Sequence, residues 1–267
     1  MIKRIDPDNK IFKSAEFLKD KYEYNLVIKN LKNVDVTLYS DEENYFICGT
    51  EKKYPAWIWT KNKIGISYIR EIEECMNLYL DEGDKSRFVC KKELYQLLVE
   101  DKYENLDSKA FEMGFYICEK IIKPQECDGY CRKATIDDLN ILTKYSYDDH
   151  KEMIVEDITI DEARKSIQDL IDKDILYVWI NNEEKVVSMA HYNSANGQST
   201  INTVYTPRDE RRHGYAANLV YYLTSKILDM GNVPLLYTDY NYLASNECYK
   251  KIGYEEKGVL INFSCSK

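Results

Sequence analysis

The sequence predicts an α+β protein in which a mixed, mostly antiparallel sheet is flanked by helices. Two observations support this fold class. Apolar residues recur with a period of two in short segments and with helical spacing in the segments between them, so strands and helices alternate along the chain. Residues 124–129 (PQECDG) interrupt this pattern near the middle of the 267 residues. We therefore expect two α/β domains, covering residues 1–125 and 126–267.

The first half mixes helical and strand-like segments in short succession. Val34, Val36 and Leu38 show the alternation of a half-buried strand, for example. The elements expected in this half are, in order, a helix at 9–22, strands at 34–39, 45–48 and 56–59, a helix at 69–80, a strand at 87–90, a helix at 93–99 and a strand at 115–122. None of its strand-to-helix junctions contains a glycine-rich or basic turn.

The second half has the expected order β-α-α-β-β-β-α-β-α-β. Thr135 and Asp138 form a capping-box pattern that starts the first helical region. The elements expected here are a strand at 130–134, helices at 139–145 and 160–171, strands at 176–180, 186–192 and 199–206, a helix starting near residue 214, a strand at 233–239, a helix carrying residues 245–249 and a final strand after Gly253.

Composition and termini indicate an ordinary folded protein. Hydrophobic residues make up 44% of the chain and charged residues 31%. No apolar run reaches the roughly 18–20 residues that a membrane-spanning helix needs. The first residues, MIKRIDPDNKIF, lack the apolar region of a signal peptide. We expect a cytoplasmic protein without a membrane partner.

The formal net charge of −9 argues against nucleic acid as the main partner. The second half nevertheless places Arg208, Arg211, Arg212 and His213 within six positions. This basic cluster indicates an anion site, while the acidic remainder would attract a cationic co-substrate. A solvated loop is the alternative reading of the charges alone.

The eight cysteines are scattered and do not form a metal-binding pattern. Cys127 and Cys131 are the only close pair, and no second pair completes a zinc site. We expect reduced, partly buried thiols and no metal.

The segment from Val204 to Ala216 carries the strongest functional signal. A strand-like segment ends at Pro207, a polar turn follows, and a helix begins near Gly214. The first N–H groups of a helix have no intrahelical partner and carry a positive partial charge, so they bind phosphate groups readily. A glycine at that point lets the anion approach the backbone.

The pattern Arg-x-x-Gly-x-Ala at 211–216 resembles the pyrophosphate loop of the GNAT (GCN5-related N-acetyltransferase) superfamily. Downstream, Asn246 and Tyr249 match the superfamily's Asn-x-x-Tyr arrangement, and residues 251–254 (KIGY) match the usual end of that helix. The resemblance covers about 135 residues of the second half. It implies that ten residues hold coenzyme A: Val204, Tyr205, Thr206, Arg211, Arg212, His213, Gly214, Tyr215, Ala216 and Asn246.

The resemblance also implies a role for two further groups. Tyr249 would be the general acid that protonates the departing thiolate, since a phenol with a pKa near 10 is protonated at neutral pH. A backbone N–H near Val204 would meet the oxyanion of the tetrahedral intermediate. Arg212 departs from the family pattern, which often has a small residue there, so its side chain has to point outwards. A core tyrosine at 249 and a surface asparagine at 246 are the structural alternatives.

A general base is not assigned by the sequence. The residues considered are Glu152, Glu156, Asp157, Asp239, His150 and His191, and many superfamily members deprotonate the amine through water instead.

These observations predict an acetyl-CoA-dependent N-acetyltransferase. The acceptor would be a cationic amine such as a polyamine, an aminoglycoside or a lysine-like group. The alternative is a sensor or interaction protein that binds acyl-CoA without catalysis. A nucleotide-binding P-loop is excluded because its Gly-Lys-Ser/Thr sequence is missing. The first half is either a degenerate GNAT repeat without a coenzyme A loop or an unrelated α/β specificity domain, and monomer and homodimer both remain open.

Overall fold

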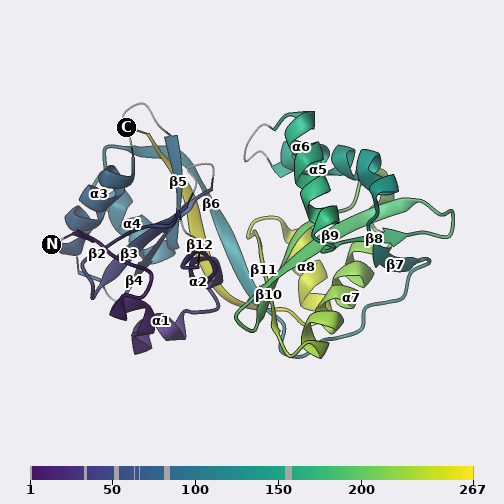
Figure 1. The fold of residues 1–267 in the computed structure, drawn as a ribbon, viewed down its shortest axis with the longest axis horizontal. Coiled ribbons are helices and arrows are strands. Elements are labelled where there is room, and N and C mark those ends of the chain that lie inside the picture. The colour runs from purple at the N-terminus through teal and green to yellow at the C-terminus, as the bar shows by residue number, and fades with distance from the viewer. Residues whose placement is uncertain are drawn as a thin grey trace. The chain divides into compact units, whose positions relative to one another are not determined.

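The computed structural model describes residues 2–32, 35–50, 54–62, 64–65, 67–80, 85–153 and 158–266. The chain forms two compact units that each combine distant parts of the sequence (Figure 1). Unit 1 contains Met1–Phe115, Thr238–Asn241 and Lys257–Lys267. Unit 2 contains Tyr116–Tyr237 and Tyr242–Glu256. The expected domain boundary at residue 125 stays a prediction.

Unit 1 is built on a sheet whose strands follow the order β1-β2-β3-β4-β5-β12-β6. Its elements are β1 (Lys3–Arg4), η1 (Lys10–Lys13), α1 (Ala15–Lys19), α2 (Asn25–Asn30), β2 (Thr37–Ser40), β3 (Tyr45–Gly49), β4 (Ala56–Thr60), α3 (Ser67–Tyr79), β5 (Lys85–Lys91), α4 (Lys92–Glu100), most of β6 (Leu106–Ile117) and most of β12 (Glu255–Ser266). Strands β4 and β5 run parallel, and β12 pairs antiparallel with β5.

Helices cover both faces of this sheet, so its central strands are buried on both sides. Successive side chains of β3 point to opposite faces of the sheet. Tyr45 and Ile47 belong to the apolar cluster beneath α3 and α4. Phe46 stacks instead on Trp59, with ring centroids 5.4 Å apart, and meets Phe17 of α1 at 5.2 Å.

Unit 2 is built on strands in the order β11-β10-β9-β8-β7. Its elements are β7 (Tyr130–Lys133), η2 (Ile136–Asp138), α5 (Leu139–Met153), α6 (Ile160–Asp172), β8 (Leu176–Ile180), β9 (Val186–Ala195), β10 (Gln198–Tyr205), η3 (Arg208–Glu210), α7 (Tyr215–Asp229), most of β11 (Val233–Asp239) and α8 (Leu243–Ile252). Neighbouring strands are antiparallel except β10 and β11, which are parallel.

Unit 2 has three layers, with α5 and α6 on one side of the sheet and α7 and α8 on the other (Figure 1). Strand β8 shows why. Tyr177 and Trp179 pack in the cluster that includes α7 and α8. Leu176, Val178 and Ile180 pack in the cluster that includes α5 and α6. Every residue of β8 is therefore buried, and the fold class expected from the sequence is confirmed.

Several boundaries differ from the expected ones. The expected helix at 9–22 is split into η1 and α1, because the Ser14 side chain accepts the N–H of Phe17 and caps a new helix. The strand expected at 115–122 begins nine residues earlier and ends at Ile117. Strand β1 and helix α2 were not expected. Val34, in the first expected strand, lies outside the described residues.

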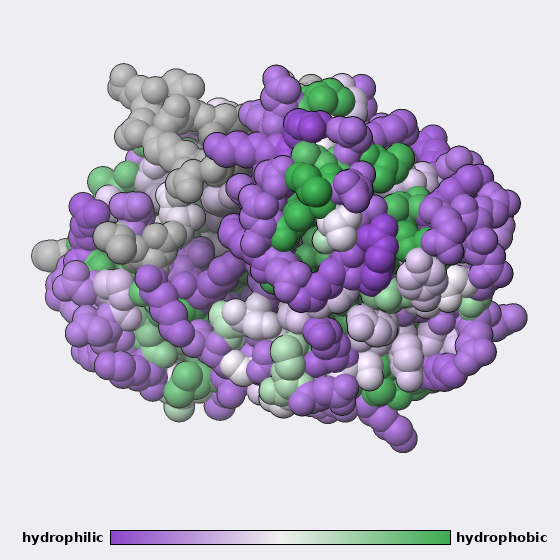
Figure 2. Space-filling model, turned by 45° about the vertical axis from the view of Figure 1, so that its right-hand side comes forward, coloured by the Kyte–Doolittle hydropathy of each residue, from purple (hydrophilic) through white to green (hydrophobic). Residues whose placement is uncertain are grey.

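The surface fits the composition. The face drawn in Figure 2 is largely hydrophilic, consistent with charged residues making up 31% of the chain. Among the described residues, no helix is both long and apolar enough to span a bilayer.

Candidate functional site

Strands β10 and β11 separate within unit 2. Their parallel register runs from Gln198 opposite Val233 to Ile201 opposite Leu236. Strand β10 continues to Tyr205, and there its recorded partner is β9, with Tyr205 opposite Met189. Beyond Ile201 the backbone of β10 is therefore no longer paired with β11. An extended ligand can pair with such an edge.

A bulge occurs at the same point of β10. The register with β9 shifts between Asn202 and Tyr205. Thr203 has a φ of +51°, a conformation that a β-branched residue rarely adopts. Strain of this kind gathers at functional sites, and here it takes Val204 out of the regular ladder.

The loop after β10 leads directly into helix α7. Gly214 is the N-cap residue, with a φ of +89° and no side-chain hydrogen bond to the helix start. A Cβ at Gly214 would meet only ordinary contacts, at 3.5 Å from Cys127 Cβ and 3.6 Å from Asn218 Nδ2. The glycine is therefore required by its backbone conformation. It leaves the first N–H groups of α7 without a side-chain cap, as expected for an anion site.

Arg212 adopts the same left-handed region, with a φ of +69°, and its side chain is exposed. This geometry explains why a small residue suits the position. His213 is also exposed, and its Nδ1 lies 3.2 Å from the Glu210 carbonyl oxygen.

Arg211 is held against the end of β10 rather than extended into solvent. Its Nε donates to the Thr206 carbonyl oxygen at 2.8 Å, and a terminal nitrogen donates to Glu152 Oε2 at 2.7 Å. The Tyr205 hydroxyl donates to Glu152 Oε1 at 3.2 Å. Arg208 lies 3.2 Å from the same oxygen. Glu152 thus anchors the loop to helix α5.

The side chains of Thr206 and Tyr215 support the loop from behind. Thr206 Oγ1 donates to Ser188 Oγ on β9 at 2.9 Å. The Tyr215 hydroxyl donates to Asp128 Oδ1 at 3.0 Å, and Asp128 Oδ2 accepts the Asn182 N–H. Segment 124–129, expected as a linker, therefore packs against the first turn of α7. Because the Tyr215 hydroxyl is engaged in this contact, Tyr215 would meet a ligand through its backbone N–H group. The same holds for Ala216, which has no polar side chain.

Helix α8 brings Asn246 and Tyr249 onto one buried face. The relative exposure of Asn246 is 4% and that of Tyr249 is 8%, so the surface alternative for Asn246 does not hold. Tyr249 packs edge-on against Tyr254, with ring centroids 6.1 Å apart. In the described part of the chain no hydrogen bond is recorded for the Tyr249 hydroxyl. Burial raises the pKa of Tyr249, so the hydroxyl stays protonated.

The base candidates fall in different places. Burial acts to raise the pKa of Glu152, but the hydrogen bonds and charges of Arg211 and Arg208 outweigh it and lower that pKa. Glu152 is thus an anchor of the loop. Asp239 accepts the N–H of Asn241 and belongs to unit 1. Glu156 and Asp157 lie outside the described residues.

The two histidines among these candidates are both partly or fully buried. His150 Nδ1 lies 2.8 Å from the Ser146 carbonyl oxygen one turn earlier in α5. His191 is 8% exposed within β9.

Asp149 was not singled out by the sequence. It lies on α5 between Tyr145 and Glu152, which both contact Tyr205 of β10. Burial raises the pKa of Asp149 to about 6, with the charge of Glu152 acting in the same direction and those of His150 and Arg211 against it. The signal in the sequence was its spacing from Glu152, one helical turn away.

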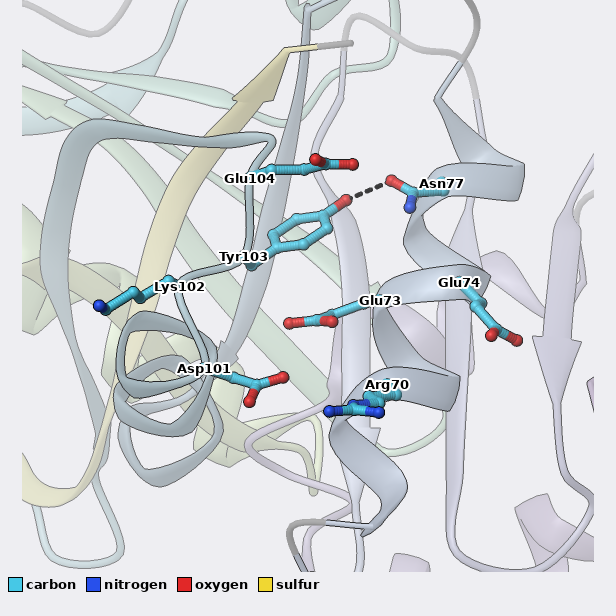
Figure 3. A pocket seen from close by; sticks show the side chains of 8 residues that line it. All are labelled: Arg70, Glu73, Glu74, Asn77, Asp101, Lys102, Tyr103 and Glu104. Carbon is cyan, nitrogen blue, oxygen red and sulfur yellow. Dashed lines mark hydrogen bonds between the residues drawn. The ribbon is translucent and has the colours of Figure 1, made fainter.

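A separate cavity of about 310 Å³ lies in unit 1 (Figure 3). Eight residues line it: Arg70, Glu73, Glu74, Asn77, Asp101, Lys102, Tyr103 and Glu104. The Tyr103 hydroxyl donates to Asn77 Oδ1 at 2.6 Å. No residue of the site built above contributes to it.

Comparison with solved structures identifies the architecture. An acetyltransferase of the GNAT family from Colwellia psychrerythraea superposes with a TM-score of 0.64 over 100% of both chains, at 12% identity. The chain has the GNAT fold. A GCN5-related N-acetyltransferase from Sphaerobacter thermophilus gives a TM-score of 0.67 over 99% of this chain and 94% of that chain, at 11% identity. Another from Kribbella flavida gives 0.62 over 95% and 96%, at 12% identity.

The comparison by sequence is narrower. The family model described as FR47-like protein matches residues 178–260, which run from β8 into β12 and include the whole candidate site after α5. No curated protein matches the chain. The GNAT fold that the resemblance implied is thereby confirmed, and at these identities the solved structures establish the fold alone.

Proposed function

We propose that this protein is an acetyl-CoA-dependent N-acetyltransferase that transfers an acetyl group to a primary amine. One observation carries the proposal. Strands β10 and β11 run parallel, so the helices that follow them, α7 and α8, begin at the same end of these strands. That end carries the unpaired edge of β10, the uncapped start of α7 at Gly214 and the helix that bears Tyr249. The GNAT fold supports the choice of an acyl-CoA as the donor.

The residues divide into three groups by what they offer the donor. The N–H groups from Arg212 to Ala216 would bind the pyrophosphate. The β10 edge at Val204–Thr206 would pair with the pantetheine arm, with Asn246 as a further hydrogen-bonding partner. Arg211 is already bonded to Glu152, so its contribution is to hold the loop in shape and to supply positive charge beside the phosphates.

Transfer needs a nucleophilic amine held against the thioester carbonyl, and binding both substrates together supplies much of the rate. The Val204 N–H would stabilise the oxyanion. The Tyr249 hydroxyl would donate its proton to the sulphur as the carbon–sulphur bond breaks.

In unit 1 a hydrogen-bonded cluster of side chains occupies the ends of the parallel strands β4 and β5, which supports a single coenzyme A site. Trp59 and Lys91 stand near the ends of the parallel strands β4 and β5. Trp59 Nε1 donates to Asp20 Oδ2 at 2.7 Å, and Lys91 Nζ donates to the same oxygen at 2.6 Å. We propose that unit 1 is a degenerate GNAT repeat that has a structural role and does not bind coenzyme A.

The test combines binding and turnover. Calorimetry with acetyl-CoA should give one site per chain, and incubation with a panel of polyamines, aminoglycosides and lysine peptides should release free thiol with at least one amine. Binding without turnover on any amine would favour an acyl-CoA sensor. Absence of binding would refute both functions.

A further inference from the structure

We infer that Asp149 is the general base that takes a proton from the acceptor amine, an inference that rests on the proposed acetyl transfer. The assignment starts from the face of α5 that meets the end of β10. Residues 145, 148, 149 and 152 lie along that side of α5, because positions three and four apart are neighbours on a helix.

Both flanking residues of Asp149 on this face contact Tyr205. The Tyr145 ring lies 5.7 Å from the Tyr205 ring, between centroids. Glu152 Oε1 accepts the Tyr205 hydroxyl at 3.2 Å. Asp149 lies between these two contacts along the helix. Asp148 has the same spacing from these two contacts, but it pairs with Lys144, whose side chain is 65% exposed. Asp149 is therefore the carboxylate of this stretch that is left for the end of β10.

The neighbouring carboxylates are paired and Asp149 is not. Asp148 accepts Lys144 Nζ at 2.6 Å, and Glu152 accepts Arg211 at 2.7 Å. For Asp149, no hydrogen bond or ion pair is recorded within the ranges that the structure describes. A partly buried carboxylate without a partner is available to take a proton.

The groups whose charges act on Asp149 belong to the proposed site. They are His150 and Glu152 on its own helix and Arg211 from the loop. From α8, Tyr249 is coupled to it, since the Asp149 charge is among the causes, after burial and Cys248, that raise the pKa of Tyr249. The base and the proposed acid thus belong to helices in opposite layers of unit 2.

The proton balance is complete with these two residues. The carboxylate of Asp149 takes one proton from the ammonium group of the acceptor and passes it to solvent. The freed lone pair forms the carbon–nitrogen bond, and the carbon–sulphur bond breaks with its electron pair leaving on sulphur. Tyr249 protonates that sulphur and regains a proton from the nitrogen, which leaves a neutral amide and free thiol.

The test uses the full chain and an amine that the wild-type protein acetylates. Asp149→Asn should lower kcat/KM by about 100-fold, in the range of general-base effects. The limb of the wild-type kcat profile that rises with pH near pH 6 should vanish in this variant. Acetyl-CoA affinity should be unchanged, and Asp149→Glu should restore part of the rate and the limb.

The matched control is Asp148→Asn, which removes a carboxylate from the adjacent position of α5 and should leave kcat/KM and the pH profile unchanged. Thermal melting of each variant checks folding. Full activity of a folded Asp149→Asn protein, or a wild-type kcat with no limb between pH 5 and 7, would overturn the inference while leaving acetyl transfer intact. Absence of turnover with every amine would instead overturn the proposed function, and the role of Asp149 with it.

Discussion

At the scale of single residues, Tyr249, the proposed acid, has its ring in the apolar cluster of unit 2. It is buried on α8, its pKa is raised by that burial, and it keeps its proton at neutral pH. Its spacing from Asn246 was readable from the sequence, because residues three apart share a helix face. The burial of that face was not readable, since it depends on the packing of α8 against α7.

Removing this hydroxyl should affect chemistry more than binding. Tyr249→Phe should lower turnover more than tenfold, because the thiolate would then leave unprotonated, with acetyl-CoA affinity little changed. Steady-state kinetics and calorimetry measure the two quantities. Tyr254→Phe is the control, since Tyr254 contacts the same ring but bonds Thr224 at 2.8 Å. An unaltered rate for Tyr249→Phe would remove Tyr249 from the mechanism.

Glu152 illustrates a residue that the sequence offers as a base and the structure shows as an anchor. Its side chain is 24% exposed, and its carboxylate accepts from Tyr205 and Arg211. These partners lie 53 and 59 positions along the chain, so no local pattern could reveal them. Asp149 was missed because Asp148 shares its one-turn spacing from Glu152, and only tertiary packing distinguishes the two.

The pH dependence of stability tests this assignment. The pKa of Glu152 is lowered in the folded state, so its contribution is present above the unfolded value near 4.3 and is lost as pH falls. Glu152→Gln should reduce the free energy of unfolding by about 1–2 kcal/mol at pH 7. The difference from wild type should shrink below about pH 4.

Denaturant unfolding at several pH values measures the effect. Glu183→Gln, in an exposed pair with Lys185, serves as the control and should change little. An equal loss of stability at pH 7 and at low pH would contradict the ionic role of Glu152.

At the scale of elements, the start of α7 is defined by backbone conformation. The left-handed conformation of Gly214 sets the direction in which the loop enters α7, and it leaves the first N–H groups of the helix without a side-chain cap. The sequence predicted this start to within one residue, because a basic turn, a glycine and an apolar helical stripe all coincide there. The bulge at Thr203 carries no comparable signal, since no glycine marks it.

Gly214→Ala should therefore weaken acetyl-CoA binding as well as stability. A side chain at a φ of +89° has space but is strained, with a penalty of roughly 1–2 kcal/mol. Gly197→Ala, at a φ of +74° in the β9–β10 turn with nothing within 4 Å of its Cβ, is the matched control. Both variants should lose similar stability by thermal melting, and only Gly214→Ala should lose affinity by calorimetry. If the two variants bound acetyl-CoA with equal affinity, the ligand would not bind at the start of α7.

At the scale of the whole molecule, the two units share the chain in a way that local patterns do not show. The last strand, β12, pairs with β5 from Leu260 opposite Lys91 to Ser266 opposite Lys85. Strand segments were predictable from alternation, but a strand's partner is chosen by long-range packing. Unit 1 consequently contains the C-terminal end of the chain.

A fragment of residues 1–125 should therefore fail to fold as a stable domain. It lacks β12, and with it Phe263, which is 1% exposed and lies 5.8 Å from Phe88 and 5.2 Å from Tyr95 between ring centroids. Circular dichroism and denaturant unfolding of the fragment test this. In the full chain, Phe263→Ala should lower stability by about 3–5 kcal/mol. A fragment that unfolds cooperatively would show that β12 is dispensable to unit 1.

The central claim is that coenzyme A binds at the start of α7. Hydrogen–deuterium exchange of the wild-type protein, with and without acetyl-CoA, tests it most directly. The backbone amides from Arg212 to Ala216 should become protected on binding, together with those of Val204–Thr206, because both sets would donate to or lie against the ligand. Saturating acetyl-CoA that leaves exchange in these two segments unchanged would contradict the account.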